Sequence, residues 1–148
     1  MVPVTVSTVL RGKERKVITI TPDASVYDAI ALMAENSIGA LVVVSNSTLV
    51  GILSERDYAR KVVLQSRSSK ETLVSDIMTS PVVTVSPGHT VEECMRAMTD
   101  RRIRHLPVVE GPSIVGIVSI GDLVRSVITA QGETIQLLEQ YIGGHYPG

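Results

Sequence analysis

The sequence predicts an α+β fold built from two βαββα repeats that pack about a pseudo-two-fold axis as one module. Three observations lead to this prediction. The chain of 148 residues has about the length of one domain. It aligns with itself without a gap when residues 17–57 are placed on 82–122, with 14 of 41 positions identical. The hydrophobic period also changes in the same order within both copies.

The first half of each repeat predicts a short strand and a helix. The β-rich run VITIT at 17–21 is ended by Pro22, and helical spacing follows over 25–36. Ser25 is the expected N-cap of that helix, with an acidic residue three positions later, near the carboxylate position of a capping box. The second copy repeats this arrangement before its helix at 90–100.

The second half of each repeat predicts two apolar strands and another helix. In the first copy the strands are 40–44 and 49–54, joined by the turn-like SNST, and YARKVVLQ forms the helix after Asp57. In the second copy the turn is EGPS, and LVRSVITA forms the helix after Asp122.

The remaining segments lie outside the repeats. We divide the chain into an N-terminal segment, a first repeat, a linker, a second repeat, and a C-terminal helix and tail; these cover residues 1–16, 17–66, 67–81, 82–130 and 131–148. ETIQLLEQYIGG predicts one more helix, with Ile135, Leu138 and Ile142 on one side. His145 and Tyr146 are expected to belong to a frayed tail.

Composition excludes several classes of protein. The net charge is −1, and Trp and Phe are missing, so neither a basic surface nor stacking platforms for a nucleic-acid polymer are indicated. The longest apolar run, at 38–44, is far shorter than the ~18 residues that span a bilayer. The N-terminal basic residues follow the apolar ones, the reverse of a secretory signal. With the single Cys94, these features predict a cytoplasmic protein.

The motif GILSERD at 51–57 returns as GIVSIGD at 116–122. Each is apolar and then abruptly polar, as expected of a buried strand that delivers Ser and Asp at its carboxyl end. A G-x-G-x-x-G, a P-loop, an H-E-x-x-H and a nucleophile elbow are all missing from the sequence. We therefore expect a binding protein that is not an enzyme, with no catalytic residue and no catalytic cofactor.

Four motifs together resemble the CBS (cystathionine-β-synthase) domain: VxTxxP, a helix bearing Ala and Met, Ile-x-x-Leu-x-Val-Val, and GIxS-x-x-D. Because each motif occurs twice, over roughly 17–130, the chain resembles a tandem CBS pair, or Bateman module, of the stand-alone bacterial kind. The resemblance implies two clefts that each take an adenine nucleotide: AMP, ADP, ATP, NAD(H) or S-adenosylmethionine. It implies that the motif Asp binds the ribose hydroxyls, that the motif Ser lies near ribose and phosphate, and that the first strand reads the adenine edge.

The resemblance and the residue chemistry together give a set of candidate ligand-binding residues. A carboxylate suits a vicinal diol, and arginine binds phosphate oxygens bidentately. The set is Thr19, Ile20, Pro22, Gly39, Ala40, Ser54, Arg56, Asp57, Val85, Pro87, Arg104, His105, Ser119 and Asp122. Since Gly39-Ala40 stands where the second repeat has Arg104-His105, the two clefts are expected to differ.

Purely structural roles remain open for these residues. Asp57 could simply cap a helix, Ser54 and Ser119 could merely end strands, and Arg104 with His105 could form a solvated basic face. His105 has no second His or Cys at ligand spacing, so no metal site is expected. We expect Cys94 to be a buried thiol and His89 to be a loop histidine. The core methionines are expected to be Met33, Met95 and Met98.

We expect a regulatory module that binds adenine nucleotides, AMP and NAD(H) among them, and acts on an unknown protein target. The alternative is a constitutive scaffold without a physiological ligand. We expect a homodimer that forms through the helices at 25–36 and 90–100, because the residues on their exposed faces are comparatively small or apolar. The C-terminal helix would add to the contact.

Overall fold

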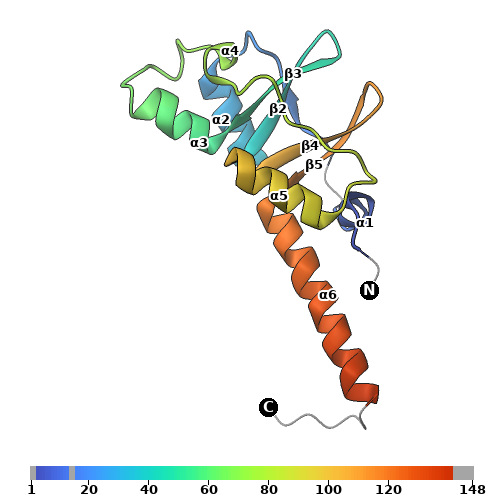
Figure 1. The fold of residues 1–148 in the computed structure, drawn as a ribbon. Helices are drawn as coiled ribbons and strands as arrows, with labels where there is room; N and C mark the ends of the chain where they lie inside the picture. The colour runs from blue at the N-terminus through green and yellow to red at the C-terminus, as the bar shows by residue number, and fades with distance from the viewer. Residues whose placement is uncertain (1–2, 14–15, 142–148) are drawn as a thin grey trace. The chain divides into compact units, whose positions relative to one another are not determined.

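The computed structural model describes residues 3–13 and 16–141, with side chains described up to residue 130 (Figure 1). Contacts divide the chain into two compact units. Unit 1 comprises residues 1–14, 85–108 and 117–148, and unit 2 comprises 15–84 and 109–116. The N-terminal segment therefore groups with the second repeat, although it precedes the first one in sequence.

Unit 2 contains a three-stranded sheet in the order β1-β2-β3. Strand β1 runs parallel to β2, and β2 pairs with β3 in antiparallel register with a bulge between Val43 and Val44. The elements are β1 (Thr19–Ile20), α2 (Val26–Asn36), β2 (Ala40–Ser45), β3 (Thr48–Ser54), α3 (Glu55–Tyr58), a π-helical turn η1 (Ala59–Val63) and α4 (Val74–Ile77).

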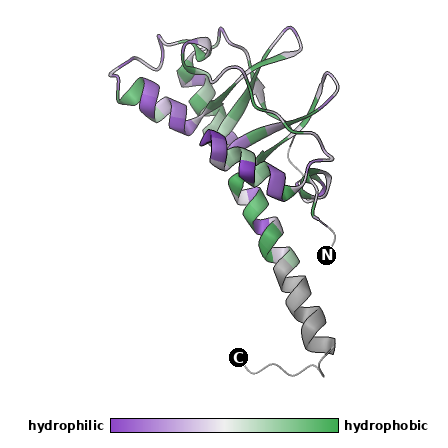
Figure 2. Cartoon of the chain, viewed as in Figure 1, coloured by the Kyte–Doolittle hydropathy of each residue, from purple (hydrophilic) through white to green (hydrophobic). Residues whose placement is uncertain are grey.

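Helix α2 packs its apolar face on the sheet, as the period of the sequence predicts. Its N-cap is Ser25, whose hydroxyl accepts a hydrogen bond from the Asp28 N–H at 3.1 Å. Val26, Ala29 and Met33 are buried in one cluster that includes Leu41, Val43 and Leu53 of the strands. Figure 2 shows these strands as mainly hydrophobic.

Unit 1 contains α1 (Val6–Arg11), α5 (Val91–Arg101) and α6 (Ile120–Tyr141). It also contains the two ends of the hairpin of β4 (His105–Glu110) and β5 (Ser113–Ser119), whose residues 109–116 belong to unit 2. Helix α5 begins with a full capping box between Thr90 and Glu93. The hairpin turn uses Gly111 at a positive φ of 59°, which glycine adopts without steric cost. The expected first strand of this repeat is reduced to one parallel bridge between Val85 and Val108.

Two helices differ from the sequence prediction. The helix expected after Asp57 already begins at Glu55, and it continues as a π-helical turn to Val63. The two helices expected in the C-terminal part are one continuous helix, α6, because a single glycine at 132 costs a helix only about 1 kcal/mol and does not end it. The structure does not describe the side chains of Ile135 and Leu138. Ile142, His145 and Tyr146 lie wholly outside the described residues.

The interior confirms most of the buried residues that the sequence indicates. Cys94 is fully buried, and burial raises the pKa of its thiol, with a further contribution from the Glu93 charge. Met33 and Met98 belong to the core, whereas Met95 is half-buried. Among the described helices, none combines the length and apolar character that crossing a bilayer requires.

Candidate functional site

The last strand of each repeat ends in a serine that caps the following helix together with the motif aspartate. The Ser54 hydroxyl accepts from the Asp57 N–H at 3.1 Å, and the Asp57 carboxylate accepts from the Ser54 N–H at 3.0 Å. Ser119 and Asp122 exchange the same two bonds at 3.2 and 2.8 Å. The capping role considered for Asp57 is therefore present, with serine as the N-cap and aspartate three residues later.

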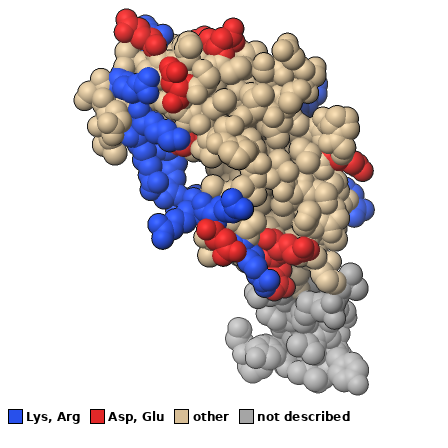
Figure 3. Space-filling model, turned by 45° about the horizontal axis from the view of Figure 1, so that its top comes forward, with Lys and Arg blue, Asp and Glu red and all other residues tan. Residues whose placement is uncertain are grey.

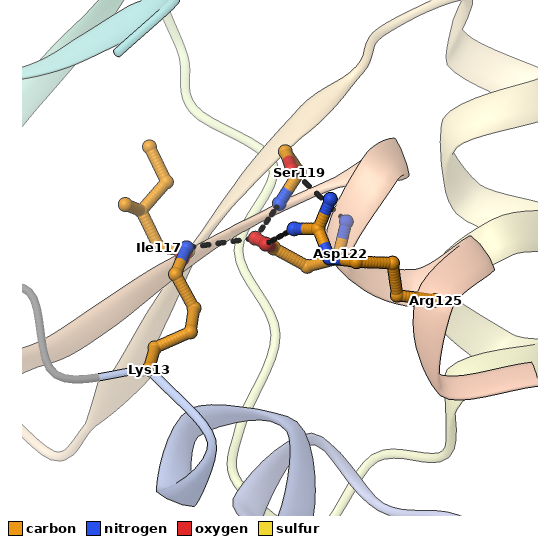
Figure 4. A network of polar contacts seen from close by, with 5 residues as sticks. All are labelled: Lys13, Ile117, Ser119, Asp122 and Arg125. Carbon is orange, nitrogen blue, oxygen red and sulfur yellow. Dashed lines mark hydrogen bonds and ion pairs between the residues drawn. The ribbon is translucent and has the colours of Figure 1, made fainter. Parts of the chain in front are cut away.

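Asp122 is the most buried of the charged candidate residues and is paired with two cations (Figure 4). Its Oδ2 accepts from the Ser119 N–H and, at 2.7 Å, from the ammonium of Lys13. Its Oδ1 accepts from the Arg125 guanidinium at 2.6 Å. The Lys13 ammonium also donates to the Ile117 carbonyl oxygen at 2.8 Å. A carboxylate that is only 7% exposed is thus held by two cations and one backbone N–H.

These contacts set the protonation of Asp122. Burial by itself would raise the pKa of the carboxyl group, but hydrogen bonds from Lys13 and from the Ser119 N–H outweigh it, so the pKa lies below its ordinary value. Asp122 is consequently ionised at neutral pH. An ionised, partly enclosed carboxylate is a strong acceptor for hydroxyl groups.

Replacing Asp122 by asparagine should remove an acid-sensitive part of the stability. A lowered folded-state pKa stabilises the fold above the ordinary value of 3.8, and this contribution disappears as pH falls through the lower folded-state value. Urea midpoints of wild type and Asp122→Asn should therefore differ most near neutral pH and converge as the pH falls below the ordinary value of 3.8. A difference that stays constant from neutral to strongly acid pH would contradict this assignment.

A cavity of about 410 Å³ lies within unit 1 beside Asp122. Its volume falls within the range of about 300–1,000 Å³ for small-molecule sites. Helix α1 and the residues after it supply one part of the lining, and α6 supplies the other. The lining residues are Val4, Thr8, Val9, Gly12, Lys13, Asp122, Arg125, Ser126, Thr129 and Ala130. The lining combines one anion, two cations, hydroxyl groups and apolar side chains.

His105 and Arg104 lie at the start of β4 in the same unit. Burial lowers the pKa of His105; the Asp122 charge opposes this, while the charges of Lys13 and Arg104 add to it. The imidazole is therefore mainly neutral at pH 7. The Arg104 side chain is exposed, and its carbonyl accepts from the Ile120 N–H at 2.9 Å.

The equivalent aspartate in unit 2 is held mainly by neutral groups. Asp57 Oδ2 accepts from the N–H and the hydroxyl of Ser54, and Oδ1 accepts from the Thr79 hydroxyl at 3.3 Å. Lys61, four residues later, lies 3.1 Å from Oδ1 and donates to the Ile77 carbonyl at 2.9 Å. The two motif aspartates therefore occupy equivalent backbone positions in different environments.

The other candidates of unit 2 lie around its sheet. Thr19 and Ile20 form β1 and pair with β2, which starts at the buried Ala40. The Gly39 carbonyl accepts from the Glu55 N–H at 3.0 Å, the counterpart of the Arg104–Ile120 bond. In addition, the Pro22 carbonyl accepts from Ser75, and the Arg56 side chain is exposed.

In unit 1 the loop after Val85 contacts the N-terminal helix. Val85 is buried, and the Pro87 carbonyl accepts from the Ser7 N–H at 2.9 Å. The His89 carbonyl accepts from the Val6 N–H at 2.8 Å, and the His89 ring bonds to Ser86, as expected for a loop histidine. These bonds hold α1 in unit 1 and bring the following Lys13 to Asp122.

Sequence reasoning missed the cations around both aspartates. Lys61 and Arg125 follow their aspartates by four and three residues, a helical spacing that signals ion pairs. Lys13 gives no such signal, because it precedes the repeat and lies 109 residues from its partner. Within the described residues, no group of three or more His, Cys, Asp or Glu side chains is arranged to hold a metal ion.

Comparison with known proteins identifies the family. The model of the CBS domain matches residues 13–64 and 74–129. The mitochondrial CBS domain-containing protein CBSX3 of Arabidopsis thaliana is 44% identical over 151 residues, covering 96% of this chain and 73% of its own. The CBS domain-containing protein YhcV of Bacillus subtilis is 35% identical, covering 73% of this chain and 76% of its own.

Solved structures agree with this match. A Burkholderia ambifaria protein with CBS domains, whose name assigns it to signal transduction, has a TM-score of 0.83 and 54% identity, over 86% of this chain and 96% of its own. The CBS domain pair of MJ0100, in complex with 5′-methylthioadenosine and S-adenosyl-L-methionine, has a TM-score of 0.77 and 25% identity. This match covers 87% of this chain and 99% of that one. The α+β prediction with two βαββα repeats is confirmed. The chain belongs to the CBS-domain family and carries its domain twice, as a CBS pair.

Proposed function

We propose that this CBS pair is a non-catalytic regulatory module of the cytoplasm that binds adenine nucleotides at sites built around Asp57 and Asp122. The proposed ligands are AMP, ADP, ATP and NAD(H). The remaining candidate residues named from the sequence belong to the same proposal, as do the repeat boundaries 17–66 and 82–130.

The surroundings of Asp122 support this proposal most directly. The ionised carboxylate is the acceptor that a ribose diol requires once one donor leaves Oδ2, and the cations Lys13 and Arg125 lie within 2.7 Å of it. Beside it, the cavity of about 410 Å³ adds hydroxyl and apolar groups. A nucleotide combines a diol, an anionic phosphate and a flat apolar base, so its groups match those of the site.

The ligands of a relative point the same way. Both molecules bound to the MJ0100 pair, 5′-methylthioadenosine and S-adenosyl-L-methionine, contain an adenosine moiety. Adenosine supplies the ribose diol that we assign to the motif aspartates. An adenine nucleotide is therefore the first ligand class to test on this chain.

A thermal-shift panel tests the function. Adenosine, AMP, ADP, ATP, NADH and S-adenosylmethionine are compared with GMP as the control for the base. A ligand at about 100 times its dissociation constant should stabilise the protein by about 2.7 kcal/mol. If no adenine ligand raises the melting temperature, the protein is a constitutive scaffold, and the proposed function is wrong.

We further propose that the protein is a homodimer. The exposed face of α6 carries Val124 and Ile128, which are 40% and 62% exposed and lie one helical turn apart. Tyr27 of α2 is also exposed, and most of the surface in Figure 3 carries no charged residue. A related CBS-CP12 protein of bloom-forming cyanobacteria is hexameric. It is 31% identical to this chain, with a TM-score of 0.76, and the match covers 83% of this chain and 71% of that protein.

One part of the sequence-based dimer prediction is wrong. The exposed face of the helix at 90–100 is not small or apolar, because Glu92, Glu93, Arg96 and Asp100 of α5 are exposed. We therefore expect α6 and α2 to form the contact. Light scattering at micromolar concentration should give twice the mass of the 15.9 kDa chain, and Ile128→Asp should shift it toward the monomer. A monomer mass for the wild type would contradict the dimer.

A further inference from the structure

Lys13 is the one cation at Asp122 that comes from outside the repeats. Its ammonium is shared between Asp122 Oδ2 at 2.7 Å and the Ile117 carbonyl at 2.8 Å, and its side chain is 23% exposed. Helix α1, which precedes it, is tied to the loop after Val85 by the backbone bonds of Val6 and Ser7. Lys13 is thus held at the carboxylate by its own two contacts and by the anchoring of α1.

The bonds at Asp122 limit how a diol can bind. Each carboxylate oxygen offers about two acceptor positions. Both positions of Oδ2 are taken, by the Ser119 N–H and by Lys13, whereas Arg125 takes one position of Oδ1. A diol that donates one hydroxyl to each oxygen must therefore displace a donor from Oδ2. The Ser119 N–H belongs to the helix cap, so Lys13 is the donor that has to move.

A displaced Lys13 needs another anion. With a nucleoside, the ammonium loses its ion pair and keeps only the Ile117 carbonyl, and a partly buried charge without a counterion is costly. With a nucleoside monophosphate, the phosphate replaces the carboxylate as its partner. The cavity wall offers further phosphate donors close by, namely Arg125 and the hydroxyls of Thr8, Ser126 and Thr129.

We propose that Lys13 makes the Asp122 site select ligands that carry a phosphate over the corresponding nucleosides. This inference rests on the proposed function and adds a specificity-determining residue to it. The ion pair with Asp122 opposes any ligand that brings only a ribose. The same ammonium favours a ligand that brings a ribose and a phosphate together.

The site at Asp57 provides an internal contrast. Its lysine, Lys61, is 44% exposed and shares Oδ1 with the Thr79 hydroxyl, while Oδ2 accepts from the N–H and the hydroxyl of Ser54. A diol there can displace the two neutral hydroxyls and leave Lys61 in place. Lys61 is also more exposed than Lys13, so moving it into solvent costs less. Removing Lys61 should therefore change the preference for phosphate much less than removing Lys13.

Calorimetry on the full-length chain with AMP and adenosine tests the inference. In Lys13→Met we expect AMP to bind at least about tenfold more weakly, the loss of one charge-assisted interaction, while adenosine binds as well as to wild type or better. Lys13→Arg should retain most of the preference, because it keeps the charge. Lys61→Met is the matched control, with an expected change in the AMP-to-adenosine affinity ratio below about threefold.

The outcomes separate the two proposals. If wild type binds neither AMP nor adenosine, the proposed function itself is wrong. If wild type binds and the AMP-to-adenosine ratio of Lys13→Met stays within about twofold of it, only the role of Lys13 is wrong. Urea denaturation of each variant shows whether it is folded. If Lys13→Met is unfolded, Lys13→Gln replaces it, and an unchanged ratio there overturns the inference equally.

Discussion

Asp122→Asn should abolish or strongly weaken one nucleotide-binding event, and Asp57→Asn should do the same to the other. Asparagine keeps the shape and one acceptor oxygen but removes the negative charge. A hydrogen bond to a charged group contributes about 1.5–3 kcal/mol, so affinity should fall at least about tenfold and up to about 150-fold for each bond lost. Calorimetry on wild type and both variants would report the affinity and the number of sites.

Asparagine removes the charge but spares the helix cap, so it disturbs the fold less than alanine would. Both aspartates also accept a bond from the serine N–H at the start of a helix, and the asparagine side chain can still accept that bond. Alanine would remove the cap as well, at about 1 kcal/mol. Unchanged affinity and stoichiometry in both Asn variants would show that the repeated motif is only structural.

Variants of the candidate phosphate residues complete that series. Arg56→Ala and Arg104→Ala should weaken AMP while leaving adenosine unaffected, because both guanidinium groups are exposed and only a phosphate would recruit them. Equal losses for both ligands would mean that these arginines support the fold or the base site. Calorimetry with AMP and adenosine distinguishes these outcomes.

The elements of the fold follow from local patterns, which explains why the sequence predicts them well. Strands β2 and β3 are apolar runs that end in turn residues, and α2 and α5 follow a capping residue and an apolar stripe. Because the sequence contains an internal repeat, each of these patterns occurs twice, and each copy supports the prediction for the other. The prediction differs at the single bridge of Val85, at the helix that begins at Glu55 and continues as a π-helical turn, and at the continuous α6.

The surroundings of the aspartates could be predicted only in part. Ser54 with Asp57 and Ser119 with Asp122 are neighbours in sequence, so their pairing follows from the motif. The contact of Lys13 with Asp122 depends instead on α1 packing in unit 1, which no periodicity or motif in the sequence indicates. The most distinctive feature of the candidate site is therefore a tertiary one.

Leu41→Ala and Leu106→Ala should have the largest effects on stability. The two leucines occupy equivalent positions of the repeats, in unit 2 and unit 1, and both are fully buried. Removing a buried leucine side chain costs about 2–5 kcal/mol, because apolar contacts are lost and a cavity remains. Urea denaturation followed by circular dichroism measures the change.

Leu64→Ala is the matched control for these two variants, since Leu64 is 73% exposed and its loss should change the free energy of unfolding by less than about 0.5 kcal/mol. The pair of core variants also tests whether the units unfold together. If they do, both variants should shift one common transition by similar amounts. If Leu41→Ala splits the transition in two, the units unfold separately, and the later transition belongs to unit 1. A loss below about 1 kcal/mol in either core variant would contradict the burial of that leucine.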